Sequence, residues 1–310
     1  MSISSTDEGD EEQEPTEVPL VHLRGARSLL RQLGKRPSKR LGQHFLVDTS
    51  VLSKIVDAAR LTDRDTVIEV GPGLGILTQE LARKVARVIA VELDATLVGF
   101  LRENLASYKN VTIVLADILK TDPADLLKNE EQGTRNEGEA PDSRPYKVVA
   151  DLPYSIASPV LRHFLEAKAK PELLVVMVQL EVAKRIVARP GEMRSLSIGV
   201  QFYGRPSIVT TVHPRSFYPP PKVHSAIVRI EVYPKPAVDV PPEVLFRVVR
   251  AGFSQPRKQL RNTLASGLGL TATQAESRLA QAGIDPQRRA QTLSLEDWAG
   301  LTVAVQEPHE

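Results

Sequence analysis

The chain has 310 residues, of which 42% are hydrophobic and 25% are charged, which is enough apolar material for one large domain and a smaller one. It contains no cysteine, which excludes disulfide frameworks, thiolate catalysis and Cys-ligated metal sites. Its six histidines lack the spacing of metal ligands on a helix, so we expect no metal. The longest apolar run is about residues 173–178, far short of the ~20 residues of a membrane helix, and the first residues do not resemble a signal peptide. We therefore expect a soluble, cytoplasmic protein, and as a separate expectation we take it to be a monomer.

Acidic and basic residues are strongly separated along the chain, although the net charge is only +2. Residues 1–20 contain seven acidic residues and no Lys or Arg, so the remainder carries a net charge of +9. Residues 24–40 contain seven basic residues and no acid, and a second basic cluster lies at residues 247–261. Each cluster alone also fits a solvated surface, but together they indicate a polyanionic partner such as RNA.

The elements expected in the first part of the chain follow its composition and hydrophobic pattern. Residues 1–34 predict a disordered acidic tail and a basic lead-in. From about residue 50 to 180, strands and helices alternate, which predicts a doubly wound, parallel α/β sheet. The expected strands are 66–70, 87–91, 111–115, 147–150 and 173–178. The expected helices are 51–60, 75–84, 94–107 and one that ends near Glu166, with Ser158 as its N-cap and Pro159 in first position.

Three features complete the expected organisation. Residues 129–145 are polar and without pattern, which predicts a flexible surface insertion. After a helix at 181–189, strands at 207–212 and 225–232 predict an antiparallel hairpin at the sheet edge, joined across the proline-rich residues 217–221. Beyond a linker at 234–242, helices are expected at 243–253, 256–266, 273–281 and 294–303. The expected domains are therefore 35–233 and a small, all-helical C-terminal domain at 234–310.

A glycine-rich turn follows the first strand and begins a helix, in the sequence Glu-Val-Gly-Pro-Gly-Leu-Gly at residues 69–75. Its glycines let the backbone turn tightly and approach a ligand. Glu92 ends the second strand and Asp117 follows the third, and the carboxyl ends of parallel strands meet at one crevice. There, one carboxylate can accept hydrogen bonds from ribose hydroxyls and the other from an adenine amine. The pattern predicts a nucleoside-containing cofactor, which is either NAD or S-adenosylmethionine.

The tetrapeptide Asp151-Leu152-Pro153-Tyr154 follows the fourth strand, beside the same crevice. An exocyclic adenine amine is a poor nucleophile because its lone pair is delocalised into the ring. An oxygen of Asp151 and a following backbone carbonyl can accept both of its N–H groups and draw the nitrogen towards tetrahedral geometry. The ring of Tyr154 offers a stacking face worth about 1–3 kcal/mol. The tetrapeptide resembles the (Asn/Asp)-Pro-Pro-Tyr signature of methyltransferases that act on amino groups of planar ring systems. This resemblance implies methyl transfer to such an amino group by positioning and electrostatic stabilisation, and the alternative is an ordinary strand-end turn.

Across residues 36–265 the chain resembles the ribosomal RNA adenine N6,N6-dimethyltransferases, specifically the bacterial small-subunit (16S) branch. The matching segments are Lys-Arg-Leu-Gly-Gln-His-Phe-Leu-Val-Asp at 39–48, the glycine turn at 68–78, Val-Glu-Leu-Asp at 91–94, Ala-Asp at 116–117, the tetrapeptide at 151–154, residues 195–203, Phe-Tyr-Pro-Pro-Pro-Lys-Val-His-Ser-Ala at 217–226 and Phe-Ser-Gln-Pro-Arg-Lys-Gln-Leu-Arg-Asn at 253–262.

This resemblance implies a Rossmann-like class I methyltransferase sheet, with S-adenosyl-L-methionine as the methyl donor and S-adenosyl-L-homocysteine as the product. Two adjacent adenines in the 3′-terminal hairpin loop of small-subunit rRNA would each be methylated twice, during small-subunit biogenesis. The implied partner is the rRNA of the immature small subunit, bound in part by the helical domain. By matched position, the implied cofactor contacts are His44, Leu46, Gly71, Gly73, Glu92, Asp117 and Asp151. The implied catalytic residues at the target base are Asp151, Tyr154 and Phe217.

The chain departs from the family pattern at several positions. Asp151 replaces the usual Asn, which keeps the acceptor oxygen but adds a charge and a desolvation cost, so that a raised pKa would protonate it. Ser155 replaces Asn or another larger residue, His224 a frequent Asp, and Pro256 a frequent Arg. Two other hypotheses remain open: a mainly non-catalytic assembly factor that binds the immature small subunit, and an NAD-dependent oxidoreductase, which gives residues 151–154 no role.

Overall fold

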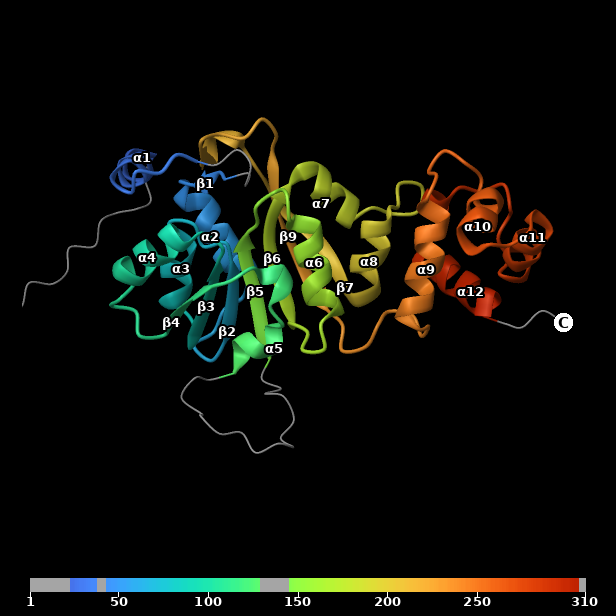
Figure 1. The fold of residues 1–310 in the computed structure, drawn as a ribbon, viewed down its shortest axis with the longest axis horizontal. Coiled ribbons are helices and arrows are strands. Elements are labelled where there is room, and N and C mark those ends of the chain that lie inside the picture. Colours follow the sequence, from blue (N-terminus) through green and yellow to red (C-terminus); the bar gives the residue numbers. More distant parts are fainter. Residues whose placement is uncertain (1–22, 38–42, 129–144, 307–310) are drawn as a thin grey trace, which may run out of the picture.

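A computed structural model describes residues 23–37, 43–128 and 145–306 of the chain. The acidic residues 1–22, residues 38–42, which include the start of the first family segment, and nearly all of the insertion expected at 129–145 lie outside the described residues. The described residues form a central sheet with helices on both faces and a group of helices at one end (Figure 1). None of their helices combines the length and the apolar character that crossing a membrane requires.

The central sheet of the described residues has seven strands in the order β4-β3-β2-β5-β6-β9-β7. The bounds are β2 Thr66–Val70, β3 Arg87–Glu92, β4 Val111–Leu115, β5 Tyr146–Asp151, β6 Leu173–Gln179, β7 Gly204–Val212 and β9 Ser225–Val232. β4, β3, β2, β5 and β6 are mutually parallel, so their carboxyl ends share one edge. β9 runs antiparallel between β6 and β7, which confirms the expected hairpin at the sheet edge.

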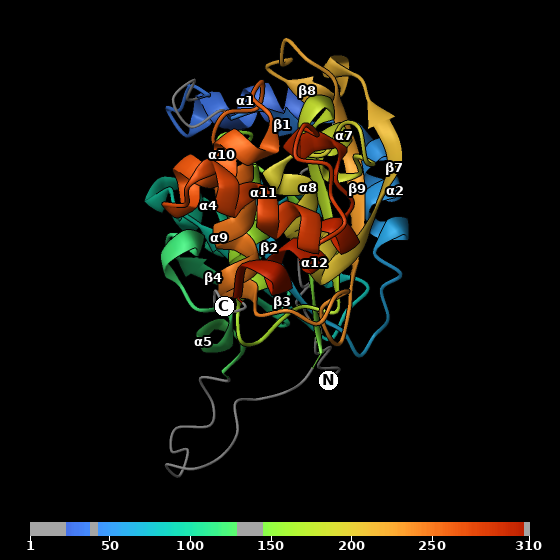
Figure 2. The same cartoon turned by 90° about the vertical axis from the view of Figure 1, so that its right-hand side faces the viewer.

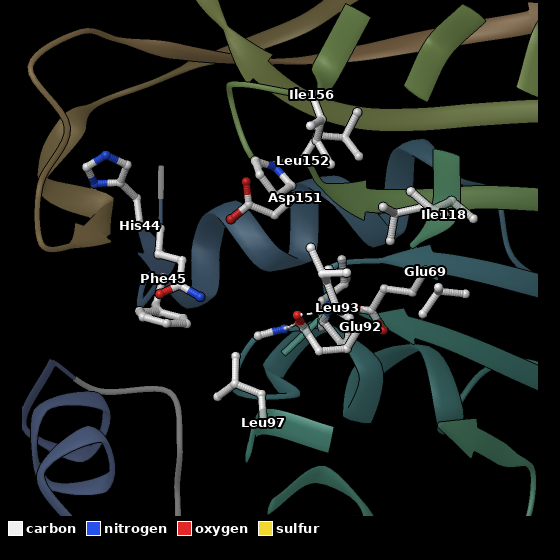
Figure 3. Close-up of a pocket in the computed structure, with 18 of the residues that line it drawn as sticks. His44, Phe45, Glu69, Glu92, Leu93, Leu97, Ile118, Asp151, Leu152 and Ile156 are labelled. Atoms are coloured by element: carbon white, nitrogen blue, oxygen red, sulfur yellow. Dashed lines mark hydrogen bonds between the residues drawn. The ribbon is translucent and has the colours of Figure 1, made fainter. Parts of the chain in front are cut away.

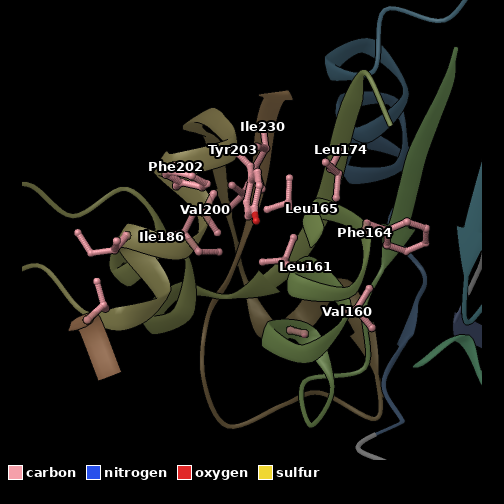
Figure 4. Packing of buried hydrophobic residues seen from close by; sticks show 14 of the residues in the cluster. Val160, Leu161, Phe164, Leu165, Leu174, Ile186, Val200, Phe202, Tyr203 and Ile230 are labelled. Carbon is pink, nitrogen blue, oxygen red and sulfur yellow. The ribbon is translucent and has the colours of Figure 1, made fainter. Parts of the chain in front are cut away.

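The sheet is covered by helices on both faces because its inner strands are apolar at almost every position. Successive residues such as Val67 and Ile68 are both fully buried but belong to two different hydrophobic clusters, one on each face. Helices α2 (Thr49–Ala58) and α3 (Ile76–Ala82) contribute to one cluster. Helices α6 (Ala157–Glu166), α7 (Leu180–Ile186) and α8 (Ser195–Tyr203) contribute to the other, as Figure 4 shows. This is the doubly wound arrangement that the strand–helix alternation predicts.

Four C-terminal helices pack together and extend the second hydrophobic cluster beyond α8. Their bounds are α9 Pro242–Phe253, α10 Leu260–Leu268, α11 Ala272–Gln281 and α12 Leu295–Gln306. Trp298 is fully buried against Gly252, where a Cβ atom would lie only 2.4 Å from the indole. Phe246 of α9 contacts the rings of Phe202 and Tyr203 of α8, at 5.5 and 6.0 Å between centroids. The helical part is therefore packed directly on the sheet-bearing part.

A second, two-stranded sheet brings the beginning of the chain to the carboxyl edge of the strands. β1 (Phe45–Leu46) pairs antiparallel with β8 (Phe217–Tyr218), which lies in the connection between β7 and β9. Helix α1 (Leu23–Gln32) lies beside this pair (Figure 2), with Arg27 over the Tyr218 ring at 4.8 Å. The sequence predicts none of these three elements.

Several expected boundaries are wrong, for local reasons. Helix α6 begins at Ala157, so Ser158 and Pro159 lie inside its first turn and Ser158 is not the N-cap. The N–H of Ile156 donates a hydrogen bond to the Pro153 carbonyl at 3.0 Å, and the turn that this bond forms continues directly into the helix. Pro159 is tolerated because the first N–H groups of a helix need no partner within it.

The helix expected at 256–266 begins four residues later, at Leu260. The N–H groups of Leu260 and Arg261 donate to the carbonyls of Arg288 and Pro286, which ties the start of α10 to a later loop. Helix α4 is shorter than expected, Ala95–Asn104, with Asp94 as its N-cap. Helices α5 (Pro123–Leu127) and α8 are present although no helix was expected there.

Candidate active site

A cavity opens at the carboxyl ends of β2, β3 and β5, with about 1210 Å³ of empty space including its mouth (Figure 3). Nine residues singled out from the sequence line this one cavity: His44, Leu46, Gly71, Gly73, Glu92, Asp117, Asp151, Tyr154 and Phe217. They come from segments up to 173 positions apart, counting from His44 to Phe217. The parallel strand order explains this, because it places the ends of β3, β2 and β5 side by side.

The glycine turn forms one wall of the cavity in a backbone conformation that other residues rarely adopt. Gly71, Gly73 and Gly75 have φ angles of +67°, +59° and +81°. A Cβ atom on Gly73 would lie 3.2 Å from the Phe45 ring. The turn therefore requires glycine both for its backbone angles and for the close approach of Phe45.

Glu92 is held in a fixed position beside this turn. Its Oε1 accepts hydrogen bonds from the N–H groups of Leu93 and Asp94 at 2.8 and 3.0 Å, and its Oε2 from the N–H of Gly73 at 3.3 Å. The side chain is buried, and this burial raises its pKa above the ordinary value even though the three N–H groups act in the opposite direction. The carboxyl group is thus preorganised at the floor of the cavity.

Asp117 lies two residues beyond the end of β4, where it caps a short 3₁₀ helix, Ile118–Lys120. Its Oδ1 accepts a hydrogen bond from the N–H of Leu119 at 3.1 Å, and its Oδ2 lies 3.6 Å from Lys120 Nζ. A third of the Asp117 side chain is exposed, so its carboxylate is more open to solvent than that of the buried Glu92. Glu92 and Asp117 therefore face the same cavity from adjacent strands.

Asp151 is the last residue of β5, and its carboxyl group faces the cavity while protein surrounds it on the other sides. No hydrogen bond or ion pair engages its side chain within the described part of the chain. Burial raises the pKa of Asp151 to about 8. The group is therefore mostly protonated at neutral pH, so that it presents both an O–H donor and a carbonyl acceptor.

Tyr154 stands at the mouth, where its two ends have separate partners. Its hydroxyl lies 2.6 Å from Ser225 Oγ at the start of β9. Its ring stacks on His44 with 5.6 Å between centroids and 30° between planes, and His44 Nδ1 lies 2.7 Å from the Pro219 carbonyl. Burial raises the pKa of Tyr154 to about 12, so the phenol stays neutral. His44 thus joins Tyr154 to the connection that carries Phe217.

Leu46 and Phe217 face each other in the β1–β8 pair and form a second apolar wall. Both are almost fully buried, with exposed fractions of 7% and 2%. The opening of the cavity is consequently bordered by three rings, those of His44, Tyr154 and Phe217.

Glu69 is a lining residue that the sequence argument mentions only as part of the glycine segment. It is 1% exposed, and its Oε2 atom has no hydrogen-bond partner among the described residues. Burial raises its pKa to about 8, and the nearby Glu92 and Asp151 carboxyl groups act in the same direction. The sequence contains a feature that points to Glu69 as a site residue, because it is the single charged residue in the strand Thr66–Val70.

The two motifs that carry the chemical argument lie next to each other. A Cβ atom on Gly71 would lie 3.5 Å from Cδ of Pro153, so the glycine turn and the 151–154 turn are neighbours in the lining of the cavity. The described residues contain no group of three or more His, Asp or Glu side chains placed to hold a metal ion. The site thus combines buried carboxyl groups, a glycine turn and an aromatic opening.

A family model described as ribosomal RNA adenine dimethylase matches residues 34–306. The chain belongs to the ribosomal RNA adenine dimethylase family. A protein of Dehalococcoides mccartyi named ribosomal RNA small subunit methyltransferase A is 49% identical over 284 residues, which cover 91% of this chain and 93% of that protein. The match spans both the sheet and the C-terminal helices, so the family assignment applies to nearly the whole described chain.

Solved structures support the same fold assignment for this family member. The crystal structure of the 23S rRNA methyltransferase ErmE aligns with a TM-score of 0.64 and 27% identity, over 85% of this chain and all of the other. A dimethyladenosine transferase from Plasmodium falciparum has the same fold, with a TM-score of 0.66 and 23% identity over 83% of this chain and 96% of its own. The Rossmann-like class I methyltransferase fold expected from the sequence is confirmed.

Proposed function

We propose that this protein transfers methyl groups from S-adenosyl-L-methionine to the exocyclic N6 of two adjacent adenines in the 3′-terminal hairpin loop of small-subunit rRNA, giving N6,N6-dimethyladenine. The observation that carries this proposal is the close approach of the glycine turn and the 151–154 turn in the lining of one cavity. A cofactor held by the first motif and an amine held by the second can meet there. Membership of the family and the small-subunit relative support the choice of substrate.

The residues present fit S-adenosylmethionine, which supplies the methyl group on a positively charged sulfur. Glu92 is held by three backbone N–H groups and lies where it can accept hydrogen bonds from ribose hydroxyls. Asp117, on the neighbouring strand end, can accept from the adenine amine. The unpartnered Oε2 of Glu69 is a suitable acceptor for the amino group of the methionine end. Together with Gly71, Gly73, His44 and Leu46, these side chains form the proposed cofactor site.

Asp151 is the proposed acceptor for the target amine. In its neutral form it offers one carbonyl oxygen and one O–H, the same pair of acceptor and donor that the amide of an asparagine offers. Its carbonyl oxygen holds one N–H of the adenine amine, and a backbone carbonyl of the adjacent turn holds the other. When the N–C bond forms and the S–C bond breaks, the positive charge passes from the sulfur to the amine nitrogen and lowers the pKa of Asp151 again. The Asp151 proton then passes to water on the open side of the cavity, and the carboxylate stabilises the product ammonium and accepts its proton.

Tyr154 and Phe217 are the proposed base-holding residues. The ring of Tyr154 is held at both ends, by Ser225 and by His44, so it offers a rigid stacking surface. Phe217 closes the opposite side of the opening but has little free surface of its own. We therefore assign most of the stacking to Tyr154, on a base that has left its RNA stack.

Transfer of tritiated methyl groups to undermethylated small subunits tests this proposal. We expect incorporation into the 3′-terminal hairpin, located by mass spectrometry, with the wild type and none with Asp151→Ala. Binding of S-adenosylhomocysteine to Asp151→Ala, measured by calorimetry, should stay within about twofold of the wild type, since the substitution removes the group that holds the target amine and leaves the other side chains of the cofactor site in place. Asp125→Ala is the matched control, because Asp125 lies on α5 and is well exposed.

A mainly non-catalytic assembly factor is the alternative, and it predicts binding to immature small subunits without incorporation above the Asp151→Ala level. Binding of NAD in preference to S-adenosylhomocysteine would instead support an oxidoreductase. We further propose that the protein acts in the cytoplasm as a monomer on the immature small subunit.

A further inference from the structure

The connection between β7 and β9, residues 213–224, borders the mouth of the cavity and is called here the rim loop. It contains Phe217 and Tyr218 of β8, and Phe217 lines the cavity itself. Figure 2 shows β8 next to β1 and α1 on the same side of the molecule. Any RNA whose base enters the cavity must therefore pass close to this loop.

The rim loop lies in a stretch without acidic residues: none is present from residue 193 to 230. Within this stretch, Arg205 and Arg229 pair with Glu231, just beyond it. Arg215 and Lys222 of the rim loop are exposed, and no carboxylate pairs with either of them in the described ranges. The loop therefore carries two cations without a paired carboxylate, one on each side of Phe217.

One carboxylate, that of Asp48, is bonded to the rim loop. Its Oδ2 accepts a hydrogen bond from Ser216 Oγ at 2.8 Å, and its Oδ1 accepts from the hydroxyl of Ser50 at 2.7 Å. Because both oxygens are already engaged by serine hydroxyls, Asp48 anchors the loop and is not an ion-pair partner of its cations.

Exposed rings and an apolar side chain alternate with these cations. His213 and His224 are exposed and meet edge to face, with 5.1 Å between their centroids. Val223, between Lys222 and His224, is 45% exposed. Proteins bind single-stranded nucleic acids with cations interleaved with exposed rings, because the cations bind the phosphates and the unstacked bases stack on the rings. A paired duplex would leave the rings unused.

The rim loop is fixed in place, so its cations have a defined position relative to Tyr154. Four hydrogen bonds tie it, or the residue that follows it, to three other segments: Val47 N–H to Ser216 C=O at 2.9 Å, His44 Nδ1 to Pro219 C=O at 2.7 Å, Leu180 N–H to His224 C=O at 2.9 Å, and the Tyr154 hydroxyl to Ser225 Oγ at 2.6 Å. Arg27 of α1 lies over the Tyr218 ring and adds a third cation beside the loop. A preorganised cationic edge loses little conformational entropy when it binds.

We propose that the rim loop, through Arg215 and Lys222, binds the phosphates of the unpaired nucleotides that flank the adenine in the cavity, while His213 and His224 stack on their bases. This inference rests on the proposed function, because it takes the RNA at the cavity as its partner. It adds a binding surface outside the cavity, made by residues that take no part in the proposed methyl transfer.

The charge part is tested with the double variant Arg215→Gln/Lys222→Gln. The matched control is Lys54→Gln/Lys84→Gln, which removes two exposed cations from α2 and from the segment after α3. The probe is an RNA hairpin whose unpaired loop contains two adjacent adenines, titrated at several KCl concentrations. We expect the slope of log K against log salt to fall in magnitude by about 1.4 in the rim variant, from about 0.7 for each lost phosphate contact. Its affinity near 0.1 M salt should fall about 10–30-fold, and the control should match the wild type.

The stacking part is tested with His213→Ala/His224→Ala. We expect at least about a fivefold loss of affinity with an unchanged salt slope, because stacking releases no counterions. A duplex of the same length should be bound equally by the wild type and by all three variants. An unchanged slope in the Arg215/Lys222 variant, or an equal loss on the duplex, overturns the proposal. If the salt slopes of the wild type and the Arg215/Lys222 variant differ as expected but the wild type methylates nothing, the proposed function fails and the rim-loop inference stands. If the wild type methylates the RNA and the two salt slopes are equal, the rim-loop inference alone fails.

Discussion

Replacement of Asp151 by Asn should stabilise the protein, by an amount that grows with pH. The folded protein keeps a proton on Asp151 up to a pKa of about 8, whereas the unfolded chain releases it near 3.8. Wild-type stability therefore falls as pH rises between these two values, and Asn, which does not titrate, removes this loss. The full difference between the two pKa values corresponds to about 5–6 kcal/mol in the free energy of unfolding. Because the cavity side of the carboxyl group is open to water, we expect about 2–3 kcal/mol at pH 8 and less than about 1 kcal/mol at pH 5.

Thermal unfolding of the ligand-free protein at pH 5 and pH 8 measures this difference. The expected gain for Asp151→Asn is roughly 5–10 °C in Tm at pH 8. Asp48→Asn is the control with the opposite sign, because hydrogen bonds from Ser50 and Ser216 help to lower the pKa of Asp48. Its substitution should destabilise the protein by the same amount at pH 5 and pH 8, since Asp48 is ionised at both. An equal gain for Asp151→Asn at the two pH values would show that its carboxyl group is well solvated and ionised throughout.

Three further predictions concern the walls of the cavity. Tyr154→Ala should raise KM for RNA by about 10–100-fold in steady-state methylation, and Tyr154→Phe far less, because stacking needs the ring and not the hydroxyl; equal losses would contradict stacking. Gly73→Ala should weaken binding of S-adenosylhomocysteine by at least about tenfold in calorimetry, since it strains a φ of +59° and approaches the Phe45 ring, whereas Gly99→Ala in α4, which meets nothing within 4 Å, should leave that affinity unchanged. Glu69→Gln should raise Tm at pH 8, because it removes a carboxyl group whose ionisation is unfavourable in the folded protein. It should also weaken S-adenosylhomocysteine binding about tenfold, because the ligand's amino group loses the carboxylate that it would neutralise. Unchanged affinity would show that Glu69 does not contact the ligand.

The central sheet could be predicted because its strands are short, apolar and regularly separated by helices. Strand ends such as Val70 and Leu115 were predicted to the residue, since polar or glycine residues follow the apolar runs. The pattern cannot show contacts that depend on distant segments. The start of α10 is set by carbonyls of residues 286 and 288, and the β1–β8 pair joins residues more than 170 positions apart. Neither leaves a periodic signal in the sequence.

The site was predictable where strand topology alone determines it. Glu92 and Asp151 follow or end strands that flank β2, so the parallel order brings them to the glycine turn. The partners of Tyr154 were not predictable, because His44 comes from the residue before the two-residue strand β1 and Ser225 from the start of β9, two strands away from β5 in the sheet. Glu69 was overlooked because its neighbours in the strand predict a structural role.

The carboxyl groups of Glu69, Glu92 and Asp151 explain why this cavity suits a cationic ligand better than a neutral one. Burial raises the pKa of all three, so each costs stability at neutral pH while no positive charge is near. The sheet itself does not need them, since apolar residues at the same strand ends would pack without this cost. A ligand with an ammonium group and a sulfonium removes most of that penalty on binding, and one with a neutral sulfur removes less. The buried carboxyl groups that destabilise the ligand-free protein therefore favour binding of the methyl donor over its demethylated product. This difference in affinity helps the product to leave after each of the successive transfers.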